Sequence, residues 1–284
     1  MGFFQGVIIA ILQGMTELFP VSSLGHAVVV PALFGWHVDR HDEAFLPFLV
    51  MLHLGTAVAL LLFFWKDWEA LTKGALGHYG QFHQRESWHI LSLLVIATIP
   101  AVIIGAIFES LLRSLFGTPD IVALLLICNG LVLLIAEKIK SRYDFEKRTP
   151  LPSIAQLTHR DALFIGCFQC AAFLPGISRS GVTIVAGLLR KLDHEMAARF
   201  SFLLALPIIL AASAHEGFKA VRVQIAFSQW ALAGFCSILA AITALLSTAF
   251  LMKYFKNNDK WALTPFALYC IGLGFFSFLV LAIF

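Results

Sequence analysis

Apolar residues occur along nearly the whole chain in runs of about 18 or more, separated by short polar segments. An α-helix of that length crosses a hydrocarbon core about 30 Å thick. The pattern therefore indicates an all-α integral membrane protein. It predicts six membrane-spanning helices, at about 44–65, 89–108, 119–136, 197–214, 229–251 and 262–284.

Two further apolar regions, 3–36 and 161–190, are each broken in the middle by a polar loop. The loops read PVSSLGH at 20–26 and PGISRSG at 175–181. Neither half of either region is long enough to span. Irregular backbone at membrane depth is tolerated only where protein buries it or where it lines a watery cavity. We therefore expect both regions to form re-entrant helix-loop-helix hairpins.

Basic residues concentrate in the segments 137–160 and 252–261, which should therefore face the cytoplasm. Counting spans from these loops makes the first hairpin open to the outside and the second to the cytoplasm. The chain then forms a single membrane domain, an inverted repeat of halves about 1–136 and 161–284 joined by the cytoplasmic loop 137–160. Paired interrupted helices in such repeats point to a ligand site where they meet.

Composition supports lipid as the solvent of this chain, which is 60% hydrophobic and 13% charged. Soluble domains carry about 25% charged residues. The net charge of +3 is small and gives no indication of a nucleic-acid partner. The five cysteines lie in apolar segments, so we expect neither disulfides nor a zinc site, and the Cys167–Cys170 pair is interpreted as helix packing.

The first loop follows a helix face that carries Gln13 and Glu17, four residues apart, and that Pro20 should end. A carboxylate inside a membrane costs at least about 2.5 kcal/mol. Glu17 should therefore meet a cation, a metal or a water-filled pocket. The alternative is a structural glutamate that caps a neighbouring helix.

Beyond the proline, Ser22 and Ser23 are natural N-cap residues for the next helix. Free amides at a helix start favour anions. His26 follows one turn after Ser23, and its near-neutral pKa suits proton transfer. A lone membrane histidine is more often a packing residue, but the company of Glu17 and Ser23 favours a functional one.

Arg179 is the decisive residue of the second loop. Its guanidinium keeps its charge and binds phosphate oxygens bidentately, so burial inside the membrane implies an anionic ligand or partner. A purely structural Glu17–Arg179 ion pair is the alternative. Hydroxyl groups surround this arginine, which suits a phosphate better than an ion pair; they belong to Ser178, Ser180 and Thr183.

Together the two loops carry a family resemblance. The stretches QGMTELFPVSSLGH (13–26) and GCFQCAAFLPGISRSGVTI (166–184) resemble the two signatures of the bacterial undecaprenyl-pyrophosphate phosphatase family, the bacitracin-resistance type. The resemblance extends more weakly to residues 48–55 and 199–207. Departures from the family pattern bear on substrate preference: His53 replaces an expected Gln, Leu49 an acidic residue and Leu24 a Thr.

The resemblance implies removal of the terminal phosphate from undecaprenyl pyrophosphate, which recycles the lipid carrier of cell-wall synthesis. It implies a bacterial inner membrane, a polyprenyl pyrophosphate lipid as partner, and a divalent cation, Mg or Ca, which we place near Glu17. The topology predicts catalysis on the periplasmic or outer side. The oligomeric state is left open, with a homodimer as one option.

Ser23 is the first choice as nucleophile, with His26 as base or leaving-group acid, and direct attack by His26 is the alternative. Glu17 and Arg179 complete the catalytic set. The side chains expected to orient the phosphates are Gln13, Ser22, Ser178, Ser180 and Thr183. A transporter or flippase of a lipid phosphate would use the same inverted repeat without needing Ser23 or His26. The acid-phosphatase superfamily is disfavoured, because its pattern needs His and Asp where this chain has Val185 and Leu189.

Overall fold

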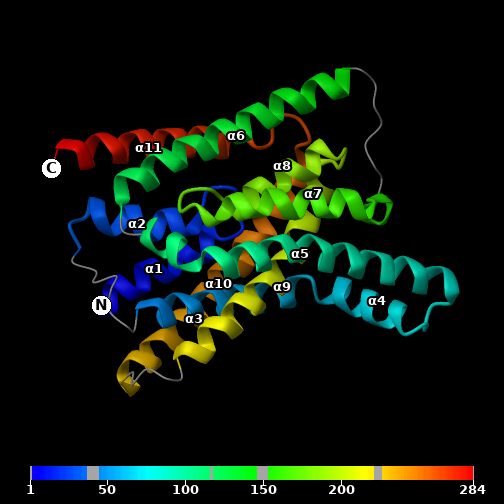
Figure 1. The fold of residues 1–284 in the computed structure, drawn as a ribbon, viewed down its shortest axis with the longest axis horizontal. Coiled ribbons are helices and arrows are strands. Elements are labelled where there is room, and N and C mark those ends of the chain that lie inside the picture. The colour runs from blue at the N-terminus through cyan, green and yellow to red at the C-terminus, as the bar shows by residue number, and fades with distance from the viewer. Residues whose placement is uncertain (1, 37–44, 116–117, 146–152, 221–225, 284) are drawn as a thin grey trace.

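The computed structural model describes residues 2–36, 45–115, 118–145, 153–220 and 226–283, and every regular element among them is helical (Figure 1). The α-helices are α1 (Phe3–Thr16), α2 (Ser23–Leu33), α3 (Phe45–Phe63), α4 (Trp65–Ala75), α5 (Gln81–Leu115), α6 (Pro119–Phe145), α7 (His159–Gln169), α8 (Arg179–Leu189), α9 (His194–Ala220), α10 (Phe227–Asn257) and α11 (Thr264–Ile283). Two short 3₁₀ turns, η1 (Ile154–Gln156) and η2 (Cys170–Phe173), flank α7.

Five of these helices, α5, α6, α9, α10 and α11, are long and apolar enough to cross a membrane. The helices α3 and α4 meet at a bend of 69° and give a sixth span if the pair is counted as one. The predicted spans are therefore confirmed as apolar helices, but several of their ends were misplaced. Polar residues 81–88 continue α5, and α4 occupies part of the segment between the predicted spans 44–65 and 89–108, because polar sequence can remain helical beyond the apolar core. The segment 37–43, which the span count puts on the outer side, lies outside the described residues.

Both predicted breaks are present. The chain leaves α1 at Thr16 and enters α2 at Ser23, and it leaves η2 at Phe173 and enters α8 at Arg179. The helices α1, α2 and α8 are apolar but have only 10–17 residues. The second break turns at Gly176, whose φ of +113° is a conformation that L side chains rarely adopt.

The longest antiparallel contact joins α6 and α11, which lie side by side in Figure 1. Glycines allow their backbones to approach closely. A Cβ atom at Gly130 would lie 2.5 Å from the carbonyl oxygen of Ala267, and one at Gly274 would lie 2.6 Å from that of Ala123. Small residues at such crossings are typical of helix packing in membranes, where close van der Waals contact supplies the attraction.

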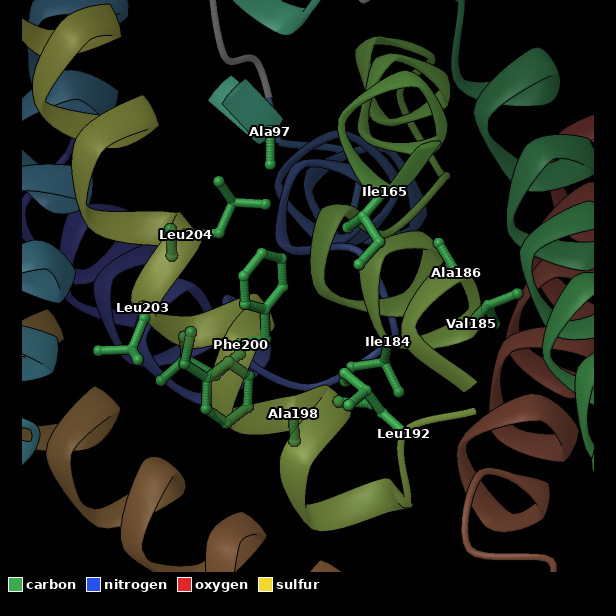
Figure 2. Packing of buried hydrophobic residues seen from close by; sticks show 14 of the residues in the cluster. Ala97, Ile165, Ile184, Val185, Ala186, Leu192, Ala198, Phe200, Leu203 and Leu204 are labelled. Atoms are coloured by element: carbon green, nitrogen blue, oxygen red, sulfur yellow. The ribbon is translucent and has the colours of Figure 1, made fainter. Parts of the chain in front are cut away.

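The main core lies where α5, α7, α8 and α9 converge. Figure 2 shows Phe200 of α9 among apolar side chains that include Ile184 of α8 and Ile165 of α7. Phe200 is almost fully buried. In contrast, large apolar side chains on the outer face of α5, such as Val95 and Ile103, are exposed, as a lipid-facing surface requires.

A polar cluster joins the ends of α6 and α9 to the turn between α10 and α11. The ring of His194, fully buried, contacts Glu137 at 2.8 Å and Asp259 at 2.9 Å. Lys140 donates to Asp259 at 3.1 Å, and the amide of Leu263 donates to Glu137 at 2.6 Å. Burial opposes ionisation of Asp259, but the hydrogen bonds from His194 and Lys140 outweigh it and hold the pKa of this carboxyl below its usual range.

We expect Gly130→Ala to destabilise the α6–α11 contact by about 1–3 kcal/mol, because the new methyl group meets backbone atoms of α11. The measurement is the midpoint of thermal unfolding in detergent. Gly272→Ala is the matched control, since a Cβ there meets nothing within 4 Å. Equal midpoints for the two variants would contradict the close contact.

We expect Asp259→Asn to reduce the free energy of unfolding at pH 7 by up to about 1 kcal/mol, since the carboxylate is half-exposed. A lowered pKa in the folded state stabilises the fold above the unfolded-state pKa of about 4, and this contribution is lost as the pH falls further. The difference between variant and parent should therefore shrink progressively as the pH falls below about 4. A difference that stays constant with pH would exclude ionised Asp259 as the cause.

Candidate active site

The two broken regions meet in an ion pair between Glu17 and Arg179. A guanidinium nitrogen of Arg179 lies 3.1 Å from Oε1 of Glu17. Both side chains are largely buried, with exposed fractions of 14% for Arg179 and 6% for Glu17. Two side chains that lie 162 residues apart in the sequence thus bring the broken regions into direct contact.

The second oxygen of Glu17 gathers three more side chains. Ser23 donates its hydroxyl to Oε2 at 2.6 Å, and Gln13 donates its amide to the same oxygen at 2.9 Å. His53 of α3 places Nδ1 3.5 Å from Oε2 and 2.9 Å from the Gln13 amide nitrogen. A serine hydroxyl bonded to a buried carboxylate has the geometry of a nucleophile with an adjacent base.

A cavity of about 220 Å³ opens beside these groups, between the two loops and the helices α3, α5 and α9. Its polar lining consists of Glu17, Ser22, Ser23, His53, Gln169, Ser178, Arg179 and Ser213. Its apolar lining consists of Leu24, Val50, Ala101, Ala172, Phe173, Ile177, Ile208, Ile209 and Ala212. A charged end and an apolar wall in one cavity suit an amphiphilic ligand with an anionic head group.

Two helix starts face this cavity. Ser22 caps α2 by accepting a hydrogen bond from the amide of Gly25 at 3.2 Å, and Ser178 caps α8 by accepting one from Gly181 at 3.1 Å. Both caps follow from a serine that precedes a helix immediately after a proline-containing turn. The positive ends of two helix dipoles therefore add to the charge of Arg179.

Five of the predicted site residues line the cavity: Glu17, Ser22, Ser23, Ser178 and Arg179. The other four lie in the layer behind it. Gln13 supports Glu17, Ser180 donates to the carbonyl of Phe19 at 2.9 Å, and Thr183 bonds Ser201 at 2.7 Å. His26 turns its ring toward α11, where it lies 2.8 Å from the hydroxyl of Tyr269. The roles predicted for these residues toward a phosphate stay predictions.

Sequence reasoning missed Asn129, a fully buried residue of α6. Its amide nitrogen donates to the carbonyl of Pro20 at 2.9 Å, and its amide oxygen accepts from the backbone of Ser178 at 2.9 Å. The two loops are thereby tied to one side chain. The signal was present, because a polar amide within the apolar run 119–136 is costly unless it has partners.

Gln169, at the end of α7, also lies in the cavity wall. It is 3% exposed, and its side-chain oxygen has no hydrogen-bond partner among the described residues. A buried acceptor of this kind is available to a ligand that carries a donor.

The surroundings of Glu17 are poorly suited to a metal ion that the protein alone would hold. Its two oxygens already accept from Arg179, Ser23 and Gln13, and a cation there would lie close to the guanidinium charge. Within the part of the chain that the structure describes, no three His, Cys, Asp or Glu side chains gather as a metal site. The metal predicted at Glu17 therefore stays a prediction.

The fold and the site define a multi-pass helical membrane protein with a buried carboxylate, guanidinium and serine at the junction of two broken helices. Comparison with known proteins gives the family. Residues 6–276 match the model of the bacitracin resistance protein BacA family, and the chain belongs to that family.

Curated relatives cover nearly the full chain. The chain is 56% identical to a protein of Gluconacetobacter diazotrophicus, over 99% of this chain and 98% of the relative. It is 52% identical to one of Granulibacter bethesdensis, over 98% and 97%, and 48% identical to one of Gluconobacter oxydans, over 98% of both chains. All three relatives carry the name undecaprenyl-diphosphatase.

We expect Asn129→Leu to lower the unfolding midpoint in detergent, because the Pro20 carbonyl and the Ser178 amide would lose a buried partner. Each unpaired group costs about 1–3 kcal/mol. Cys128→Leu, at the exposed neighbouring position of the same helix, is the control and should leave the midpoint unchanged. An unchanged midpoint in Asn129→Leu would show that the bridge contributes nothing.

Proposed function

We propose that this chain hydrolyses undecaprenyl diphosphate to the monophosphate and inorganic phosphate, recycling the lipid carrier of cell-wall synthesis. The observation that carries the proposal is the Ser23 hydroxyl bonded to Glu17, which in turn pairs with Arg179, in a cavity with an apolar wall. The names of the full-length relatives support the same reaction.

In the proposed reaction the Ser23 oxygen attacks the terminal phosphorus while Glu17 takes the hydroxyl proton. The bond between the phosphorus and the bridging oxygen breaks, and the lipid monophosphate leaves with the electron pair. Water then attacks the phosphoserine, the serine oxygen recovers its proton from Glu17, and inorganic phosphate is released.

Protonation of Glu17 has a second effect on charge. Once the carboxylate is neutral, its attraction for Arg179 falls, and the guanidinium is free to bind the phosphoryl oxygens on which negative charge gathers. The dipoles of the two capped helices, α2 and α8, act in the same direction. Electrostatic stabilisation of this kind supplies most of the catalysis in phosphoryl transfer.

The other predicted site residues also have roles in the proposed reaction. Ser22 and Ser178, which line the cavity, would orient the phosphates directly, and Gln13 would hold Glu17. Ser180 and Thr183 would act from behind the second loop. His26 belongs to the set as the residue one turn beyond Ser23, although both of its ring nitrogens already have partners.

A divalent cation, Mg or Ca, enters the proposal as a companion of the diphosphate, whose oxygens would supply most of its ligands. Such binding through substrate phosphates is common for Mg²⁺. The apolar wall of the cavity, which includes Leu24, Phe173 and Ile208, would hold the first isoprene units of the lipid.

The proposal includes the inverted repeat of two re-entrant hairpins. Packing partners support it, because exchanging α1 with α7 and α5 with α10 turns one observed pair, α1 on α10, into another, α7 on α5. Exchanging α2 with α8 and α11 with α6 likewise turns the pair of α2 and α11 into the observed pair of α8 and α6. We place the protein in the bacterial inner membrane with the first hairpin open to the periplasm. A homodimer remains one option for its assembly.

We expect Glu17→Gln to lower the rate of phosphate release from undecaprenyl diphosphate by about 10²–10⁴-fold, the usual effect of removing a general base. Ser23→Ala and Arg179→Ala should be at least as inactive. The measurement is inorganic phosphate released by purified protein in detergent. Glu69→Gln, at an exposed ion pair on α4, is the matched control and should keep parental turnover. Parental turnover in Glu17→Gln would refute the assigned site.

The same assay distinguishes a hydrolase from a transporter or flippase of a lipid phosphate. Such a protein would move the lipid between leaflets without releasing phosphate, and Ser23→Ala would leave that movement intact. Phosphate release that depends on Ser23 identifies a hydrolase.

A further inference from the structure

The peptide at Ser22 adopts an unusual conformation for a residue other than glycine. Its φ is +68° and its ψ is 97°, and the residue is 4% exposed. Conformations of this kind persist only where surrounding contacts hold them, and they are common at functional sites. Ser22 immediately precedes Ser23, so its geometry sets the direction of the proposed nucleophile.

Besides the cap on Gly25, this peptide has two contacts with His26. Its Nδ1 lies 2.7 Å from the carbonyl oxygen of Ser22, and its backbone amide donates to the same oxygen at 3.2 Å. A backbone carbonyl can only accept a hydrogen bond, so the proton of the imidazole must be on Nδ1.

The other ring nitrogen is held from a distant part of the chain. Nε2 of His26 lies 2.8 Å from the hydroxyl of Tyr269 on α11, and the two rings are nearly parallel at 3° with centroids 5.7 Å apart. With its proton on Nδ1, a neutral ring accepts the tyrosine proton at Nε2. The contact also gives the tyrosine hydroxyl a hydrogen-bond partner.

Neither ring nitrogen of His26 is therefore available to the cavity. His26 does not line it, and the Ser23 hydroxyl donates to Glu17 at 2.6 Å. Glu17 already occupies the place of the base for which a histidine would be needed.

We infer that His26 and Tyr269 act as positioning residues: the tyrosine hydroxyl fixes the ring of His26, which holds the Ser22 peptide so that Ser23 lies against Glu17. The inference rests on the proposed hydrolase function and assigns a role in it to α11. It replaces proton transfer by His26 with a structural contribution that acts through the backbone of Ser22.

Two substitutions at His26 distinguish a positioning role from proton transfer. In His26→Asn the amide nitrogen takes the place of Nδ1 and donates to the Ser22 carbonyl, but it cannot exchange a proton at neutral pH. We expect His26→Asn to keep turnover within about tenfold of the parent, and His26→Ala to lose about a hundredfold through release of the Ser22 turn. If His26→Asn is as inactive as His26→Ala while still folded, the positioning role is wrong.

Tyr269→Phe tests the second contact. It should lower kcat by about two- to tenfold and leave KM unchanged, because it removes one hydrogen bond that orients the nucleophile without touching the cavity. Tyr254→Phe is the matched control, since its hydroxyl donates to Ala262 in the polar turn after α10. Equal turnover in Tyr269→Phe and Tyr254→Phe would exclude the positioning role of Tyr269.

A measurement independent of activity completes the test. In protein labelled with ¹⁵N-histidine, the His26 signals, assigned by their absence from His26→Asn, should show a neutral ring protonated at Nδ1. A ring protonated at Nε2, or a cationic one, would overturn the inference even if every variant were active. A parent protein that releases no phosphate but shows the Nδ1 tautomer would instead refute the proposed function and leave the contact standing.

Discussion

Glu17 and Arg179 bring opposite charges together inside a helical bundle whose outer surface faces lipid. Each charge alone would be costly to bury, and removing one partner from a buried pair leaves the other uncompensated. Because the two residues belong to different breaks in the helical pattern, their attraction joins the two loops. The cavity, the helix starts that face it and the bonded Ser23 hydroxyl all lie around this contact.

The approach of the loops depends on small residues as much as on charge. A Cβ atom at Gly25 would lie 3.2 Å from Cα of Gly176, and one at Gly181 would lie 3.4 Å from Cβ of Pro20. Asn129 adds hydrogen bonds to the backbone of both loops. Close backbone contacts and the Asn129 side chain thus fix how the two loops approach each other, and the side chains of Glu17, Arg179 and Ser23 meet across that approach.

Hydropathy predicted most of the architecture because apolar length is a strong physical requirement in a bilayer. The two breaks were expected at 20–26 and 175–181 and lie a few residues earlier, at 17–22 and 174–178, since prolines, glycines and serines interrupt an otherwise apolar pattern. Helix ends such as that of α5 at Gln81 were not, because polar sequence remains helical outside the apolar core. Side-chain direction was also beyond reach: His26 turns toward Tyr269, which is 243 residues away in the chain and gave no local signal. The meeting of Glu17 with Arg179 was among the alternatives considered, because two intramembrane charges of opposite sign favour each other.

The separation of that pair along the chain has a consequence for biogenesis. Arg179 follows Glu17 by 162 residues, and ribosomes add about 5–20 residues per second. Arg179 is therefore synthesised about 10–30 s after Glu17. During that interval the carboxyl group must take up a proton, stay near water or rest beside the insertion machinery. Glu17 thus gains its ionic partner only after more than half of the chain has been synthesised.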